Sequence, residues 1–440
     1  MIQRLFDWLD RSSCNFLTVK TVEEELLKRG FREVRQNEDW SVVEGGKYYL
    51  KKNGGAVFAF TIGSGKDCFK NGVRIIAAHS DSPCFRIKPK PEIYGEGGVV
   101  SLNVEKYGGG ILYTWFDRPL SISGRIMVSQ EGTLVPREIL VDLKRPVAVI
   151  PDLAIHFNRQ VNEGISLSVQ KDMKPVIGYF SKEEIEKAKR NHGILLPVIS
   201  ESAGVSPEDV IDYELSLYPV GKAELSGINN EYFESGRIDD LSMVFAGLEA
   251  LLQTESEEVP FIRLLAVFDN EETGSATRQG AASPVLRDLL ERVNRSLGGS
   301  PDDFHIGIAN SFMISADDAH AWHPNYNEKY DPTNHPVIGG GPVIKINSSG
   351  KYMTDSRGAS VFKILCRLSG VRWQIFVNHA DVAGGSTLGN ILTSQMDING
   401  VDVGAAIWAM HSAVETAGVG DHEDMVKVFT TFYSEKRALV

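Results

Sequence analysis

Two apolar runs in the chain end abruptly in polar residues, as buried strands do where they reach the edge of a sheet. They cover residues 73–78 and 263–268. The first leads into His79-Ser80-Asp81, and the second into Asp269-Asn270-Glu271-Glu272, with a glycine at 274. Neighbouring carboxylates at the end of a buried strand cost free energy unless a cation or a shared proton holds them. The pattern therefore predicts a metal-dependent hydrolase.

Helical periodicity predicts further elements around these strands. Apolar residues recur at 241, 244, 245, 248 and 251, which is one face of a helix. Residues 21–30 begin with threonine and acids and end in bases and glycine, which also favours a helix. Other helices are expected at 181–190, 284–297 and 404–416. Strands are expected at 56–60, 305–308 and 425–433.

A stretch with a different pattern, rich in glycine and in β-prone runs, interrupts these elements. Glycines cluster between 95 and 98 and at 108–110, and β-prone runs follow at 111–116, 122–128 and 148–150. These features predict a β-rich insertion. We therefore expect an α/β protein with a discontinuous domain, residues 1–91 and 225–440, that has a mixed sheet flanked by helices. The inserted β-rich domain is expected at residues 92–224.

Composition narrows the class of protein. The 440 residues include 46 basic and 58 acidic side chains, a net charge of -12, which argues against non-specific binding to nucleic acid or anionic membranes. It does not exclude an acidic substrate. Four scattered cysteines are typical of reduced thiols in a cytoplasmic protein. No apolar run approaches the ~18 residues of a membrane span, and the N-terminus does not resemble a secretory signal.

Several short motifs offer ligands for a metal. In His79-Ser80-Asp81, residues two apart share a face of a strand, so Asp81 can fix the tautomer of a metal-binding His79. A histidine near a chance acid is the other interpretation. In Gly236-Arg-Ile-Asp239-Asp240, one aspartate, for example Asp240, is explained as a helix N-cap, and the other then needs another partner.

The Glu271-Glu272 pair is the stronger signal. A metal hydrolase needs one carboxylate as a ligand and another to take a proton from water. Further donors occur in Ser315-Ala-Asp317-Asp318-Ala-His320 and at His323, some of them ordinary hydrogen-bonding groups. His411 falls on an apolar face of the helix expected at 404–416, where a histidine is more often a core residue than a ligand. Walker A, G-x-S-x-G, H-E-x-x-H and G-x-G-x-x-G motifs are absent from the sequence.

Taken together, the chain resembles the aspartyl aminopeptidase family of dizinc exopeptidases. The matching blocks are Ala78-His-Ser-Asp-Ser-Pro-Cys84, Trp115-Phe-Asp-Arg-Pro119, Gly236-Arg-Ile-Asp-Asp240, Asp269-Asn-Glu-Glu-Thr-Gly-Ser275, Ser315-Ala-Asp317, Gly341-Pro-Val-Ile-Lys-Ile-Asn347 and Ala409-Met-His-Ser412. They occur in the family's order and span nearly the whole chain.

The resemblance implies two zinc ions per subunit, with Co²⁺ or Mn²⁺ as possible substitutes. It implies the following metal ligands: His79 and Asp317 on one ion, Glu272 and His411 on the other, and Asp239 bridging them. Glu271 would be the general base that activates water, and Asp81 would orient His79. The implied reaction removes the N-terminal residue of a peptide.

The resemblance also implies substrate contacts and assembly. Lys345 is a candidate partner for an acidic N-terminal side chain, which would give a preference for Asp or Glu, and Tyr352 would donate to the oxyanion. His156 would reach the active site of a neighbouring subunit, so the inserted domain would act in dimerisation and as a lid. A homodimer that assembles into a tetrahedral dodecamer is expected.

Three alternatives remain open from the sequence. The enzyme could prefer neutral N-terminal residues, with Lys345 serving the metal centre. It could be a dizinc hydrolase of N-acylated amino acids, which would need a carboxylate site instead of an amine site. It could also be a non-catalytic assembly protein that kept the fold, although all the proposed ligands and the base are present.

Overall fold

The computed structural model describes residues 1–440 and divides into two compact units. The larger unit comprises Met1–Asp81, Ala223–Met410 and Glu415–Val440. The smaller unit comprises Ser82–Lys222 and the short segment His411–Val414. The smaller unit thus begins ten residues before the insertion expected at 92–224, because it includes the whole strand Cys84–Tyr94.

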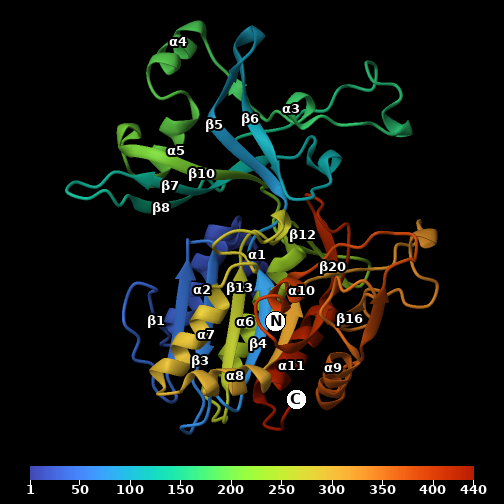
Figure 1. Cartoon of the computed structure of the whole chain (residues 1–440). Helices are drawn as coiled ribbons and strands as arrows, with labels where there is room; N and C mark the ends of the chain where they lie inside the picture. Colours follow the sequence, from blue (N-terminus) through green and yellow to red (C-terminus); the bar gives the residue numbers. More distant parts are fainter. The chain divides into compact units, whose positions relative to one another are not determined.

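A nine-stranded mixed sheet forms the centre of the larger unit (Figure 1). Its strands, in spatial order, are β1 (Arg32–Glu33), β2 (Lys47–Lys52), β3 (Ala56–Thr61), β13 (Ile262–Phe268), β4 (Val73–His79), β14 (Phe312–Ala316), β18 (Asn399–Gly404), β16 (Val343–Ile346) and β17 (Gln374–Val377). The four strands β13, β4, β14 and β18 run parallel to one another. Strands β4 and β13 are buried along their whole length, which explains their continuous apolar sequence.

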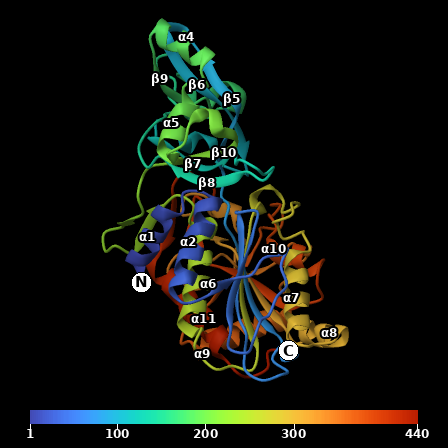
Figure 2. The same cartoon turned by 90° about the vertical axis from the view of Figure 1, so that its left-hand side faces the viewer.

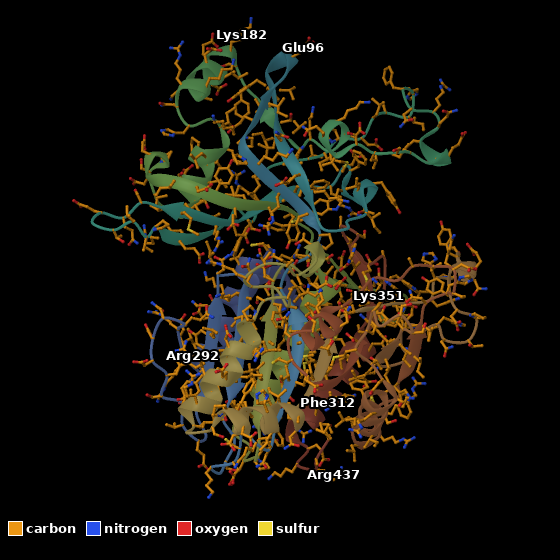
Figure 3. All side chains as sticks on the ribbon, viewed as in Figure 1. Glu96, Lys182, Arg292, Phe312, Lys351 and Arg437 are labelled. Carbon is orange, nitrogen blue, oxygen red and sulfur yellow. The ribbon has the colours of Figure 1, made fainter.

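Helices cover both faces of this sheet (Figure 2). One face carries α1 (Ile2–Arg11), α2 (Asn15–Lys28), α6 (Ile238–Thr254), α9 (Ser356–Leu368) and α11 (Val419–Ser434). The other carries α7 (Val285–Ser296), α8 (Pro301–Ala309) and α10 (Leu388–Thr393). Each layer buries an apolar core against the sheet; Phe312 of β14 lies in one of them, whereas Arg437 lies at the periphery (Figure 3). The larger unit therefore has the expected α/β layering.

A second, five-stranded sheet completes the larger unit. Its order is β11 (Glu224–Ser226), β12 (Tyr232–Ser235), β20 (Glu415–Gly418), β19 (Ala406–Trp408) and β15 (Ala319–His320). Strands β19 and β20 pair in antiparallel fashion, with Trp408 opposite Thr416. The segment 409–414 is therefore the connection of a hairpin.

The smaller unit is built on a six-stranded antiparallel sheet, as its glycine-rich, β-prone sequence predicts. The order is β8 (Arg137–Asp142), β7 (Leu120–Val128), β10 (Val210–Pro219), β5 (Cys84–Tyr94), β6 (Val99–Tyr107) and β9 (Val176–Tyr179). Its helices are α3 (Val169–Asp172), α4 (Lys182–Arg190) and α5 (Leu195–Ala203). Helix α4 begins with a reciprocal capping box between Ser181 and Glu184. Glu96 and Lys182 lie at the same end of this unit (Figure 3), since β6 pairs with β9.

Four of the predicted secondary-structure elements are wrong. Residues 404–416 form the end of β18, β19, the hairpin connection and the start of β20 rather than a helix, because the short apolar run there fits either structure. Residues 425–433 belong to helix α11, although their β-branched and aromatic side chains favour a strand. Residues 305–308 lie in α8, which Ser300 caps. Residues 111–116 contain a 3₁₀ turn at Leu112–Trp115 instead of a strand.

No helix of the structure combines the length and the apolar character needed to cross a lipid bilayer.

Buried His422 should make the stability of the fold depend on pH. Its imidazole is 1% exposed, neither ring nitrogen has a hydrogen-bond partner, and its ring lies 5.5 Å from that of Phe245. Burial lowers the pKa of His422 to about 3. Below the ordinary histidine pKa of about 6.5, only the unfolded chain takes up this proton, so His422 destabilises the fold as pH falls.

We expect the free energy of unfolding of the wild type to fall by about 1.4 kcal/mol more than that of His422→Leu between pH 7.5 and pH 5.5. Urea denaturation at the two pH values measures this difference. Equal losses in both proteins would show that His422 is not kept neutral by the fold.

Candidate metal centre

The carboxyl ends of three parallel strands place the predicted ligands at one edge of the central sheet. In the register, His79 of β4 is opposite Phe268 of β13, and Ala77 is opposite Ser315 of β14. The residues that follow β13 and β14 therefore emerge beside His79. This explains why segments almost 240 residues apart in the sequence supply one site.

His79 is buried, and its ring is oriented by Asp81. Nδ1 lies 3.0 Å from the backbone carbonyl oxygen of Asp81 and 3.5 Å from its carboxylate. A carbonyl can only accept, so Nδ1 carries the proton and Nε2 is left as the donor atom for a metal. Nε2 lies 3.5 Å from Oδ1 of Asp239 and 4.0 Å from Oδ2 of Asp240.

Glu271 and Glu272 lie on a 3₁₀ turn, Glu271–Thr273, directly after β13. The carboxylate of Asp81 accepts both of their backbone amides, at 3.1 Å for Glu271 and 3.2 Å for Glu272. Asp81 therefore fixes the turn that bears both acids as well as facing His79. Donor atoms of His79, Glu271 and Glu272 all lie within 4.8 Å of one another.

Asp239 and Asp240 precede the regular part of α6 and are joined by a cis peptide bond. Oδ2 of Asp240 accepts the backbone amide of His79 at 3.0 Å, so this carboxylate ties α6 to β4 and is used differently from a helix cap. Asp239 offers donor atoms within 4.8 Å of those of His79 and also of Glu272. Asp239 therefore lies between two donor groups, whereas the carboxylate of Asp240 holds a backbone amide.

Asp317 follows β14, and the close approach of β18 positions it. A Cβ at Gly404 would come within 1.9 Å of the Asp317 carbonyl oxygen, so only glycine fits there. Nζ of buried Lys345 donates to Oδ1 of Asp317 at 2.8 Å and lies 5.8 Å from the ring centre of Tyr352. Burial alone would lower the pKa of Lys345, but the charge of Asp317 raises it above its usual value.

Two of the predicted residues belong to the smaller unit. His411 is the third residue of the segment 409–414 that connects β19 to β20, and the first of the four residues of that segment that belong to the smaller unit. Its carbonyl accepts the amide of Ile111 at 2.9 Å, and a Cβ at Gly109 would lie 3.3 Å from its Nδ1. His156 is exposed, in the connection between β8 and β9.

The electrostatics of the larger unit's cluster favour a cation. Burial raises the pKa of Asp240 well above its usual value, with the charges of Asp317 and Asp318 adding to it. Burial also raises the pKa of Glu271 to about 7, again with a contribution from Asp317. Burial alone would lower the pKa of His79, but Asp240 and its neighbours raise it well above the usual value. A divalent cation among these groups would favour their unprotonated forms.

The donor set also fits zinc in type and spacing. Imidazole nitrogen and carboxylate oxygen are zinc ligands, and two such donors on one tetrahedral ion lie about 3.4 Å apart. Nε2 of His79 and Oδ1 of Asp239 are 3.5 Å apart. The residues of this unit are therefore suited to hold zinc.

Three further buried carboxylates support the cluster, and sequence reasoning assigned them no such role. Glu415 accepts the backbone amide of Asp239 at 3.1 Å. Asp318 accepts the Ser242 hydroxyl at 2.8 Å and the Ala405 amide at 3.2 Å, joining α6 to the start of β19. Asp402 accepts the Met353 amide at 2.6 Å and contributes to the field at Lys345. The one signal in the sequence was the position of Asp318 next to Asp317, in the same motif as a predicted ligand.

A parallel sheet that gathers imidazole and carboxylate donors at its carboxyl edge defines a metal-dependent hydrolase. Comparisons with known proteins give the family. The aminopeptidase I zinc metalloprotease (M18) profile matches residues 8–433. A probable M18 family aminopeptidase 2 of Clostridium acetobutylicum is 46% identical over 432 residues, which cover 98% of each chain.

Solved structures agree with this assignment. A chain of the cryo-EM structure of the Ape4 and Nbr1 complex superposes with a TM-score of 0.94 at 34% identity, covering 98% of this chain and 85% of that one. The mApe1 dodecamer of S. cerevisiae gives a TM-score of 0.86 at 29% identity, covering 99% and 97%. The chain belongs to the M18 family and is a zinc-dependent aminopeptidase.

Removing the metal should destabilise the protein, because the buried carboxylates then lose their counter-charge. A zinc ion present at 100 times its dissociation constant stabilises the fold by about 2.7 kcal/mol. We expect a chelator to lower Tm and added zinc to restore it, in a calorimetric measurement. His79→Ala should respond less than the wild type. An unchanged Tm after verified metal removal would show that the cluster does not depend on a cation.

Proposed function

We propose that the enzyme removes the N-terminal residue of peptides with two zinc ions per subunit. In this proposal, His79 and Asp317 would hold one ion, Glu272 and His411 would hold the other, and Asp239 would be shared by both. Hairpin connectivity supports His411, since β19 and β20 hold both ends of its segment in the larger unit. Co²⁺ or Mn²⁺ would suit the same donors.

The single observation that carries the proposal is the close clustering of the proposed base with the proposed metal ligands. Donor atoms of Glu271 and Glu272 lie within 4.8 Å of those of His79, and Nε2 of His79 lies 3.5 Å from Asp239. When bound, the zinc ions would supply Lewis-acid polarisation of the scissile carbonyl and of a water molecule.

Glu271 is the proposed general base. Without a cation, burial raises the pKa of Glu271 to about 7. Bound zinc would lower this pKa, so Glu271 would be an unprotonated base that accepts a proton from water near neutral pH and passes it on to the departing amine. Asp81 holds the Glu271 amide and so fixes the position of this group. Tyr352 is proposed to donate to the oxyanion.

Glu271→Gln should lower kcat by about 100-fold to 10,000-fold, because the amide cannot accept the proton. The zinc content should stay that of the wild type. Peptide kinetics and elemental analysis of the same preparation test both points, and exposed Glu258→Gln serves as the control. Near-normal turnover would remove Glu271 as the base.

The rival reaction, hydrolysis of N-acylated amino acids, uses the same metal chemistry. An aminopeptidase anchors a free α-amine and should leave N-acetylated peptides intact. Comparing free with acetylated forms of one peptide separates the two reactions. Faster cleavage of the acetylated form would favour the amidohydrolase, and turnover of neither form would favour an assembly protein.

The preference for N-terminal Asp or Glu is also a proposal, and it depends on Lys345. The ammonium group has three N–H donors, so it can hold Asp317 and still donate to a substrate carboxylate. Its pairing with Asp317 equally suits the alternative in which Lys345 serves the metal centre and the enzyme prefers neutral residues. Tyr352 lies beside the same ammonium group in both cases.

Lys345→Met distinguishes these alternatives. A charge-assisted hydrogen bond is worth about 1.5–3 kcal/mol, so kcat/KM should fall about 10-fold to 100-fold more for Asp-peptides than for Leu-peptides. Exposed Lys351→Met is the matched control. Equal losses on both peptides would contradict the acidic preference and support the neutral one.

Assembly is proposed to use the smaller unit. Around exposed His156, the side chains of Leu153, Ile155 and Phe157 are 56%, 49% and 81% exposed, which is apolar surface that a second copy would cover. His156 would then reach the neighbouring active site, within a dimer that builds a tetrahedral dodecamer. Light scattering that gives a monomer would contradict this.

Four free cysteines support the cytoplasm as the proposed compartment.

A further inference from the structure

The backbone amide of Asp239 needs an acceptor outside its own helix. Asp239 has φ of −76° and ψ of 108°, which is not helical, so the ordinary ladder of α6 does not begin at this residue. A buried amide without a partner would cost about 1–3 kcal/mol. Oε2 of Glu415 accepts this amide at 3.1 Å, and the Glu415 residue is 1% exposed.

Glu415 is itself held rigidly. It is the first residue of β20 and lies opposite Ser235 of β12 in the antiparallel ladder. Three residues, 236–238, then connect β12 to Asp239. The hydrogen bond from Asp239 to Glu415 therefore closes a short loop, in which the carboxylate sets the position at which α6 departs from the sheet.

The same residue borders the segment that carries His411. Residues 409–414 join β19 to β20, and β20 begins at Glu415. Glu415 thus accepts a hydrogen bond from the proposed bridging ligand, Asp239, and lies four residues after another proposed ligand, His411.

The choice of a carboxylate at position 415 suggests a role beyond accepting the backbone amide of Asp239. A neutral glutamine would accept the amide without adding a negative charge to a cluster that is already acidic. A buried anion in this place is costly unless a cation lies nearby.

We infer that Glu415 is a positioning residue that fixes Asp239 for metal binding and thereby sets the zinc affinity of the centre. This inference rests on the proposed dizinc function. Glu415 acts through the amide of Asp239 and not by touching substrate. Carboxylates behind metal ligands typically change metal affinity by about 10-fold to 100-fold when they are removed.

The test compares zinc affinity in Glu415→Gln and Glu415→Ala, measured on the full-length enzyme by competition with a chromophoric chelator. We expect affinity to fall about 10-fold in Glu415→Gln, which keeps an acceptor, and about 100-fold in Glu415→Ala, which does not. At saturating zinc, kcat should fall in the same order while KM changes little. Partial rescue by Gln is the signature of a positioning role.

Glu234→Gln is the matched control, because Glu234 lies on the neighbouring strand opposite Thr416 and is half-buried. It should bind zinc as the wild type does. Zinc affinity within twofold of the wild type in both Glu415 variants would overturn the inference. If Glu415→Ala does not fold by circular dichroism, Glu415→Gln decides alone by the same criterion. A wild type that binds fewer than two zinc ions would instead overturn the proposed function itself.

Discussion

Buried negative charge at the carboxyl edge of the central sheet is the constraint on which the rest of this protein depends. Asp81, Asp239, Asp240, Asp317 and Glu415 are all buried there. Lys345 supplies one compensating positive charge, through Asp317. An isolated buried carboxylate is costly, so such a cluster is stable only when protons or metal cations neutralise it. Zinc binding and folding of the larger unit are thus parts of one equilibrium.

The fold meets this constraint through backbone amides. Asp81 accepts the amides of Glu271 and Glu272, Asp240 accepts that of His79, and Glu415 accepts that of Asp239. Each of these carboxylates fixes the backbone of another segment that offers a ligand or the base. Parallel strands bring the segments together, and the carboxylates then set their geometry. The same groups therefore act in both structure and chemistry.

The parts of the site that the sequence predicted are those with local signals. Strands β4 and β13 were predictable because long apolar runs end in polar residues, and so the positions of His79 and Glu272 followed. The hairpin around His411 was not predictable, because the six-residue apolar run at 405–410 fits a helix and a strand equally well. The sequence also carries no sign of which backbone amide meets Glu415, since that contact joins residues 176 apart.

The most direct measurement is a crystal structure of the zinc-loaded enzyme with anomalous scattering recorded at the zinc edge. We expect two anomalous peaks per subunit, one contacting His79 and Asp317, the other contacting Glu272 and His411, with Asp239 between them. A single peak, or peaks ligated by Asp240 or Glu415 in place of Asp239, would contradict it.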